Sequence, residues 1–311
     1  MEIAISTILT IVGLVMLCFG GNWLVNGGVA IAKKFRISNL VIGMTIVAYG
    51  TSTPELAASV AAAGEHSAII LGNVIGSNIA NVGMVIGVAS ILVPLAVTKS
   101  VLKKEIPIML GVSMLLVILS IDGEISSYDG MLLLVGLGGF ALYTLKNALK
   151  QRAEKEEELT PLKNNIYLKS AGLIILGISF LYIGAILTVD NAVILAKELG
   201  LSEKIIGLTI IAIGTSLPEL ITSIIAIRKG HTDIGIGNII GSNIYNILMI
   251  MGIGATLGGV MIVSDVYIDY AIMILFSASL LIALKTRIIN RTIGFCLIIG
   301  YAMYLVTTFF K

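Results

Sequence analysis

The stretch that decides the fold occurs twice: GTSTPELAAS covers residues 50–59, and GTSLPELITS covers residues 214–223. Each copy carries one carboxylate, Glu55 or Glu219, inside an otherwise apolar segment. A charge inside a lipid bilayer is costly, so an intramembrane acid indicates a functional site. Two such acids at matching places in a duplicated chain predict one site that is built from two halves.

A second phrase follows each copy, GNVIGSNIAN at residues 72–81 and GNIIGSNIYN at residues 237–246. The first phrases are offset by 164 residues and the second phrases by 165. Positions outside the phrases also match at the offset of 164, for example Gly43 and Gly207. The duplication is therefore expected to include most of the chain.

The composition is that of a membrane protein, with 57% hydrophobic and 12% charged residues and a mean hydropathy of +1.05. Soluble domains carry about 25% charged residues. A membrane-spanning helix needs about 20 mainly apolar residues. Ten segments meet this requirement approximately: 3–27, 39–63, 68–95, 104–121, 128–147, 168–192, 203–227, 234–260, 266–285 and 291–309. The sequence thus predicts an all-α polytopic membrane protein with ten transmembrane helices.

One long polar stretch, residues 147–166, divides the ten segments into two sets of five. We expect a first repeat at 1–146, a cytoplasmic linker at 147–166 and a second repeat at 167–311. Because each repeat has an odd number of spans, the second is predicted to be inverted relative to the first. Inverted repeats are typical of transporters that bind substrate near the middle of the membrane.

Basic residues predict the orientation in the membrane. All but three of the 20 Lys and Arg residues fall in loops on one side of the predicted spans, the exceptions being Lys197, Lys204 and Lys311. Loops rich in Lys and Arg face the cytoplasm. We therefore expect a multi-pass protein of the cell membrane with both termini outside.

A proline follows the Gly-Thr-Ser phrase in each copy, at Pro54 and Pro218. Proline lacks an N–H, and its ring crowds the carbonyl four residues earlier. The helix is expected to kink or break just before each proline, which frees backbone carbonyls near Thr51 and Thr215. In a membrane such carbonyls must line a cavity or meet a ligand.

The polar side chains of the motifs repeat at helical spacing, so each group is expected on one face of a helix. These groups are Ser52, Glu55 and Ser59; Ser216, Glu219 and Ser223; Asn73, Ser77 and Asn81; and Asn238, Ser242 and Asn246. All their possible ligand atoms are oxygens, which suit a hard cation such as Ca²⁺, whereas zinc or copper would favour His or Cys. No Lys or Arg lies mid-span to neutralise the acids, so one Ca²⁺ or two monovalent cations would balance them.

Each feature alone has a structural alternative. A proline kink, a pair of closely spaced glycines, or a Ser or Asn within a membrane helix often serves only packing. The duplication of the whole set favours function.

At these residues the chain resembles the cation/calcium antiporter superfamily, and the G-T-S-x-P-E phrase is similar to its sodium-driven, prokaryotic branch. The resemblance implies that Glu55 and Glu219 bind both Ca²⁺ and Na⁺, and that Thr51 and Thr215 offer backbone carbonyls. It further implies Na⁺ ligands at Ser52, Ser77, Ser216, Ser242, Asn81 and the carbonyls of Ala48 and Ala212. Asn73, Asn238 and Asn246 complete the predicted set.

Asn246 stands where many relatives and the potassium-dependent exchangers carry an acid. The resemblance therefore predicts no potassium co-transport, and it leaves the stoichiometry open.

The sequence accordingly predicts a secondary antiporter that exchanges Na⁺ for Ca²⁺ by alternating access. The alternatives are a proton- or Mg²⁺-coupled exchanger and a cation channel. We expect no enzymatic activity, no cofactor, no nucleic acid and no obligatory protein partner; the expected partners are the two transported ions and the lipid bilayer.

Overall fold

The chain forms long apolar helices because a bilayer offers no water to backbone groups, which must therefore bond within the helix. The computed structural model describes residues 2–64, 67–153, 166–198, 200, 212–262 and 266–310. Most of the predicted linker and residues 203–211 of the seventh predicted span lie outside these ranges.

Among the described residues, seven helices are long and apolar enough to cross a membrane. They are Ile3–Phe35, Ser67–Leu92, Ser127–Gln151, Leu168–Glu198, Thr232–Gly258, Val266–Leu284 and Arg291–Thr308. The protein is thus a polytopic helical membrane protein. Three more apolar stretches are shorter or broken. The stretch 39–61 is interrupted at Ser52, 101–119 has charged residues in its first turn, and 212–228 contains the described part of the predicted span 203–227.

The first half contains α1 (Glu2–Phe35), α2 (Asn39–Ile42), η1 (Gly43–Val47), α3 (Ala48–Thr51), α4 (Thr53–Ala61), α5 (Ser67–Ala80), η2 (Asn81–Ile86), α6 (Gly87–Leu92), β1 (Leu95–Ala96), η3 (Val101–Glu105), α7 (Ile106–Leu119), β2 (Glu124–Ile125) and α8 (Ser127–Ala153). The second half contains α9 (Ile166–Glu198), α11 (Ala212–Thr215), α12 (Leu217–Arg228), α13 (Thr232–Tyr245), η5 (Asn246–Met251), α14 (Gly252–Gly258), β3 (Val260–Met261), α15 (Val266–Ser279), η6 (Leu280–Leu284), β4 (Ile288–Ile289) and α16 (Arg291–Phe310).

Two helical rods form the centre of the molecule. The rods α5–η2–α6 and α13–η5–α14 are 78% and 83% buried over their most apolar windows. Each changes from α to π geometry at the last asparagine of its motif, Asn81 or Asn246. Such π segments within α-helices are frequent at functional sites.

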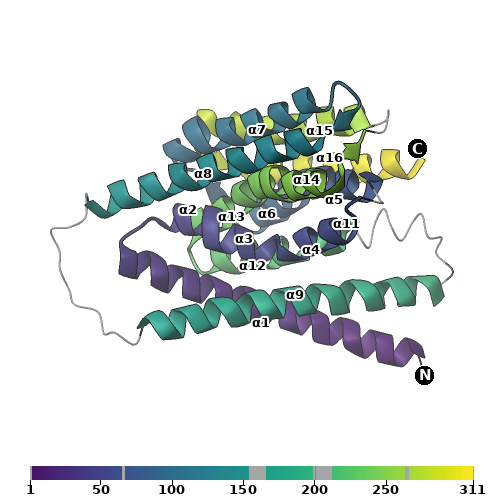
Figure 1. Cartoon of the computed structure of the whole chain (residues 1–311). Helices are drawn as coiled ribbons and strands as arrows, with labels where there is room; N and C mark the ends of the chain where they lie inside the picture. The colour runs from purple at the N-terminus through teal and green to yellow at the C-terminus, as the bar shows by residue number, and fades with distance from the viewer. Residues whose placement is uncertain are drawn as a thin grey trace.

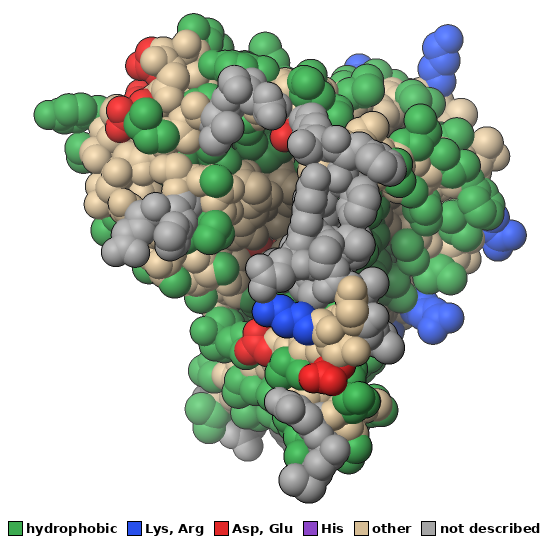
Figure 2. Space-filling model, turned by 90° about the vertical axis from the view of Figure 1, so that its right-hand side faces the viewer, with side chains coloured by type: hydrophobic (Ala, Val, Ile, Leu, Met, Phe, Trp, Pro, Cys, Tyr) green, Lys and Arg blue, Asp and Glu red, His purple; other side chains and the backbone are tan. Residues whose placement is uncertain are grey.

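The peripheral helices present apolar side chains to the outside, where lipid would lie. Val135, Leu142 and Ile175 are among the large exposed hydrophobic residues. Figure 2 shows hydrophobic side chains around the outline of one end of the molecule. This exposure is the pattern expected of a protein whose solvent is mainly hydrocarbon.

Helices α1 and α9 lie against each other along one edge of the molecule (Figure 1). The N-terminus and the C-terminus lie at the same end, whereas the end of α8 and the start of α9 lie at the other. The two halves are therefore joined at the end opposite the termini.

Two short antiparallel ribbons link the halves. Strand β1 pairs with β4, with Leu95 opposite Ile289. Strand β2 pairs with β3, with Ile125 opposite Val260. Each ribbon takes one strand from the first half and one from the second.

Candidate functional site

The helix breaks predicted from the prolines are confirmed. The backbone leaves helical geometry at Ser52 (φ −82°, ψ 6°) and at Ser216 (φ −90°, ψ 4°). In both copies a new helix, α4 or α12, begins at the next residue, with the proline in its first turn. This is the one part of a helix where the missing N–H removes no hydrogen bond.

The two copies meet at Glu219, which is fully buried. Ser52 of the first copy donates a hydrogen bond from Oγ to Glu219 Oε1 over 3.2 Å. Ser242 of the second copy donates to the same oxygen over 3.3 Å. The Thr51 hydroxyl lies 3.0 Å from Asn238 Oδ1 and 3.4 Å from Ser242 Oγ. Residues that are far apart in the chain thus form one polar cluster.

Glu55 is also buried, but neither of its carboxylate oxygens has a hydrogen-bond partner among the described residues. The hydroxyls of Ser77 and Ser216, which correspond to Ser242 and Ser52, likewise have none there. Ser52, three residues before Glu55, donates to Glu219, so the two carboxylates belong to the same buried cluster. Burying a charge without a partner is very unfavourable, so this arrangement favours a bound cation.

An asparagine holds the serine after the glutamate in both copies. Asn73 Nδ2 donates to Ser59 Oγ over 2.8 Å and to the Glu55 carbonyl over 2.9 Å. Asn238 Nδ2 donates to Ser223 Oγ over 3.0 Å. These contacts join α4 to α5 and α12 to α13, so each pair of neighbouring motif phrases packs as a unit.

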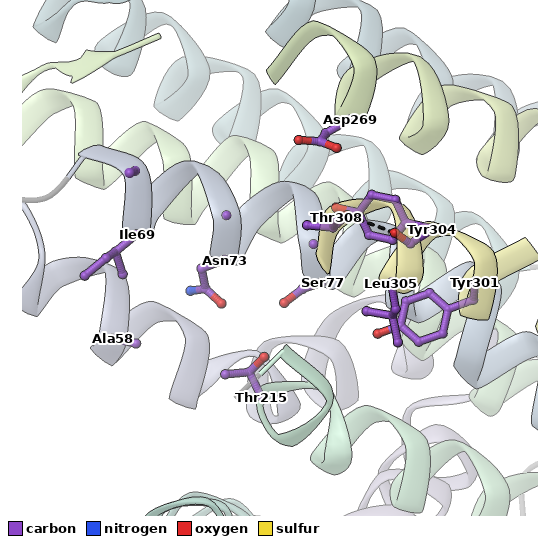
Figure 3. Close-up of a pocket in the computed structure, with 13 residues that line it drawn as sticks. Ala58, Ile69, Asn73, Ser77, Thr215, Asp269, Tyr301, Tyr304, Leu305 and Thr308 are labelled. Atoms are coloured by element: carbon purple, nitrogen blue, oxygen red, sulfur yellow. Dashed lines mark hydrogen bonds between the residues drawn. The ribbon is translucent and has the colours of Figure 1, made fainter. Parts of the chain in front are cut away.

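A cavity of about 340 Å³ lies beside the first copy. Figure 3 shows Asn73 and Ser77 on α5 and Thr215 on α11 facing it, with Tyr301, Tyr304 and other α16 residues on the opposite wall. Three predicted site residues therefore border space that is large enough for water or ions.

The structure also reveals two buried residues that the helical spacing of the polar side chains missed, Asn78 and Asn243. Asn81 Nδ2 donates to Asn243 Oδ1, and Asn246 Nδ2 donates to Asn78 Oδ1, both over 3.0 Å. Asn78 and Asn243 stand at equal places in the duplicated G-S-N phrase. That repetition is the sequence signal that could have identified them.

The backbone positions predicted from the resemblance differ between the copies. The Ala48 carbonyl accepts from Ser52 N–H over 3.0 Å and from the Thr51 hydroxyl over 3.3 Å. In the second copy, Ser216 N–H bonds instead to the Ile213 carbonyl over 3.1 Å, and Ala212 is the first residue of α11. The second break therefore has a tighter turn than the first.

The cluster is rich in oxygen and poor in positive charge. Ser52 and Ser242 donate to Glu219 Oε1 through hydroxyls, and no group of three His, Cys, Asp or Glu gathers within the described ranges. Two carboxylates surrounded by amide and hydroxyl oxygens match the preferences of hard cations. The arrangement can therefore bind such ions.

A protein-family model described as "Sodium/calcium exchanger protein" matches residues 5–146 and 169–310. The chain is 32% identical to the sodium/calcium exchanger MaX1 of Methanosarcina acetivorans, over 99% of both chains. It is 36% identical to the inner membrane protein YrbG of Escherichia coli, over 97% of this chain and 96% of that one. A solved structure of the sodium-calcium exchanger NCX_Mj superimposes with a TM-score of 0.86 at 32% identity and covers 98% of this chain and 99% of that one.

Proposed function

The chain belongs to the sodium/calcium exchanger family, and we propose that it is a secondary antiporter that exchanges Na⁺ for Ca²⁺ at the paired motifs. It is a transporter and not an enzyme, and its substrates are the two ions. The observation that carries the proposal is the pair of buried carboxylates: Glu219 accepts from the hydroxyls of Ser52 and Ser242, and Glu55 has no hydrogen-bond donor within the described ranges. One Ca²⁺ or two Na⁺ would balance their charge, so the two ions would compete for one cavity.

The proposed ligand set pools both copies. Glu55 and Glu219 supply the charge that both ions share. The neutral ligands are Thr51, Thr215, Ser52, Ser216, Ser77, Ser242, Asn81, Asn246, Asn73, Asn238 and the carbonyls of Ala48 and Ala212. Support comes from the contacts between copies at Glu219 and from the buried oxygens of Glu55, Ser77, Asn81 and Asn246, which lack partners among the described residues.

We further propose ten membrane helices, arranged as two inverted five-helix repeats at 1–146 and 167–311 with a linker at 147–166. The contact between α1 and α9 supports the inversion. A Cβ added to Gly13 would lie 2.8 Å from the Gly184 carbonyl, and one added to Gly20 would lie 2.8 Å from the Gly177 carbonyl. Gly13 and Gly177 are equivalent at the offset of 164, as are Gly20 and Gly184. Reciprocal contacts of this kind are expected where a twofold axis relates equivalent, antiparallel helices, and they support the proposed inversion.

The two β-ribbons support the same axis. Leu95 of β1 corresponds to Val260 of β3, and Ile125 of β2 corresponds to Ile289 of β4. Exchanging the halves therefore converts one ribbon into the other. The family model also matches in two pieces, one on each side of the linker.

For the orientation, we propose that the end carrying both termini faces outward, since the linker and most of the basic residues belong to the opposite side. The termini lie together at one end (Figure 1). The relatives MaX1 and YrbG are prokaryotic proteins, which supports a prokaryotic cell membrane.

The proposal is tested by uptake of radioactive Ca²⁺ into proteoliposomes under an imposed Na⁺ gradient, without K⁺. We expect uptake that reverses with the gradient, needs no K⁺, and depends on Na⁺ with an apparent order above one. A flux that is driven by pH and indifferent to Na⁺ would replace Na⁺ with H⁺ as the coupling ion. Ca²⁺ flux that persists without any counter-ion would indicate a channel.

A further inference from the structure

Four asparagines join the two central rods, and their contacts repeat across the copies. Asn78 Nδ2 lies 3.3 Å from the Asn243 carbonyl, and Asn243 Nδ2 lies 3.4 Å from the Asn78 carbonyl. Asn246 donates to the side chain of Asn78, and Asn81 donates to the side chain of Asn243. All four residues are at most 1% exposed.

These contacts determine which way each amide points. A backbone carbonyl can only accept a hydrogen bond, so the NH₂ group of Asn78 must face the Asn243 carbonyl. The Oδ1 of Asn78 then faces the other way and can only accept, so Asn246 must present its NH₂ group there. The same reasoning, applied to Asn243, orients Asn81.

The sulfur atoms nearby follow the same symmetry. Met273 Sδ lies 3.6 Å from Asn78 Nδ2, and Met109 Sδ lies 3.6 Å from Asn243 Nδ2. Met109 and Met273 are equivalent at the offset of 164. Because thioether sulfur is at most a weak acceptor, it favours the same orientation of both NH₂ groups.

This orientation leaves the side-chain oxygens of Asn81 and Asn246 without a described donor. With their NH₂ groups engaged, Asn81 and Asn246 have Oδ1 atoms that are buried and lack a hydrogen-bond partner among the described residues. An unpaired acceptor in the membrane interior is unfavourable. An amide oxygen that is held in place without a donor is, however, well suited to a hard cation.

We propose that Asn78 and Asn243 are positioning residues that hold the amide oxygens of Asn246 and Asn81 toward the transported cation. The proposal rests on the proposed function, since it assumes a cation between the copies. Asn78 and Asn243 themselves do not touch the ion. Without them, an Asn246 or Asn81 side chain can turn its NH₂ group toward the cavity, which repels a cation.

A double-mutant cycle separates orientation from packing. An aspartate offers an oxygen whichever way it turns, so it does not need the orienting partner. The cycle therefore compares Asn78→Leu in the wild type with Asn78→Leu in an Asn246→Asp background. The mirror cycle uses Asn243→Leu and Asn81→Asp, and it tests the same claim if one set of variants does not fold.

Two readouts are measured on each purified variant. The first is the Ca²⁺ KM and maximal rate of Na⁺-driven uptake in proteoliposomes. The second is the rise in Tm that Ca²⁺, Na⁺, Mg²⁺ or Mn²⁺ produces in detergent, which reports binding without transport. Tyr270→Phe is the matched control, because it removes a buried 2.7 Å hydrogen bond to Ser120 at the end of α7, between two residues outside the motif phrases.

We expect Asn78→Leu to raise the Ca²⁺ KM about tenfold in the wild type, but less than about threefold when residue 246 is aspartate. The ion-induced Tm shift should follow the same pattern, whereas Tyr270→Phe should alter neither readout. An equal loss in both backgrounds would overturn the positioning role and leave only packing. If the wild type shows no Na⁺-driven Ca²⁺ uptake, the proposed function fails, and the cycle is then judged with the cation that raises the wild-type Tm; if none does, both proposals fail.

Discussion

The two motif copies have nearly the same sequence but differ in structure. In the second copy Glu219 accepts hydrogen bonds from Ser52 and Ser242. In the first copy Glu55 has no partner among the described residues, and neither do the corresponding hydroxyls. The polar cluster is thus closed around one glutamate and open around the other.

The described contacts of two equivalent glycines also differ. A Cβ added to Gly237 would lie 2.7 Å from the Leu40 carbonyl, so α13 approaches α2 as closely as glycine permits. A Cβ added to the equivalent Gly72 would meet no described atom within 4 Å. Asn73 is half-buried beside the cavity, whereas Asn238 is fully buried.

With the inverted repeats proposed above, this difference explains how one duplicated sequence could serve both sides of a membrane. If two equal copies adopt two different conformations, exchanging those conformations produces a state of equal energy that opens to the other side. Alternating access then needs no element beyond the duplication. The difference between the copies could depend on the conformational state of the protein or be fixed by the sequence, and the following variants distinguish the two.

The largest effect is expected for Glu55→Gln and Glu219→Gln. Each removes half of the fixed negative charge, so each should reduce Na⁺-driven Ca²⁺ uptake at least about a hundredfold. Without ions, Glu55→Gln should raise Tm more than Glu219→Gln does, because the Glu55 carboxylate lacks a hydrogen-bond donor.

The matched control for these variants is Glu105→Gln, since Glu105 is also a buried carboxylate but lies outside the motifs and accepts from Tyr143 over 3.1 Å. It should keep near-normal uptake. Normal exchange by either folded motif variant would remove the central assignment.

The glycine pair should give the next effect. Gly237→Ala should destabilise the protein by about 1–3 kcal/mol, because its Cβ would press against the Leu40 carbonyl. Gly72→Ala should leave the ion-free Tm nearly unchanged yet slow uptake about tenfold, because it would obstruct the opposite, exchanged state. Thermal unfolding and uptake are measured on both variants. Full activity in Gly72→Ala would argue that the first copy never closes as the second does.

Ser52→Ala and Ser216→Ala compare the two hydroxyls directly. Without ions, Ser52→Ala should destabilise by about 1 kcal/mol, because Glu219 loses a donor. Ser216→Ala should have little effect on stability, since its hydroxyl has no partner within the described ranges. During turnover both should slow uptake by similar factors, within about threefold of each other. Strongly unequal turnover rates would mean that the copies do not exchange roles.

Asn246→Asp tests the uncharged last residue of the group formed by Asn238, Ser242 and Asn246. Added carboxylate charge near Glu55 and Glu219 has no described basic partner to offset it. The variant should take up an additional monovalent cation, seen as a new K⁺ or Na⁺ dependence, or should become more sensitive to pH. Uptake is measured across Na⁺, K⁺ and pH series, with Asn81→Asp as the counterpart. An unchanged ion dependence and pH profile in Asn246→Asp would contradict the placement of Asn246 beside the transported ions.

The smallest effect should come from His231, which precedes α13. Burial, and then the nearby charges of Lys33 and Lys229, lower the pKa of His231 below its ordinary value of 6.5. The neutral ring can accept from Asn39 Nδ2 at 3.4 Å. Because its folded pKa is lowered, stability is complete above about pH 6.5 and is lost as the pH falls through the folded pKa. His231→Gln should reduce this acid-side loss in a series of Tm against pH; an identical series would show that another group titrates.

Much of the site could be read from the chain alone. Pro54 and Pro218 made the helix breaks predictable, since proline cannot donate a backbone hydrogen bond wherever it stands. The duplicated spacing made it possible to group Glu55 with Glu219. These features depend on local backbone geometry or on repetition, and both can be recognised in the amino-acid sequence.

Only the tertiary structure decided which residues of one copy contact the other. The hydrogen bond from Ser52 to Glu219, and the orientation of Asn246 by Asn78, join residues more than 160 positions apart. The difference between the copies could not be predicted either, because nearly equal sequences have nearly equal local preferences. Packing around the pair selects one conformation for each copy, and that selection is a property of the whole fold.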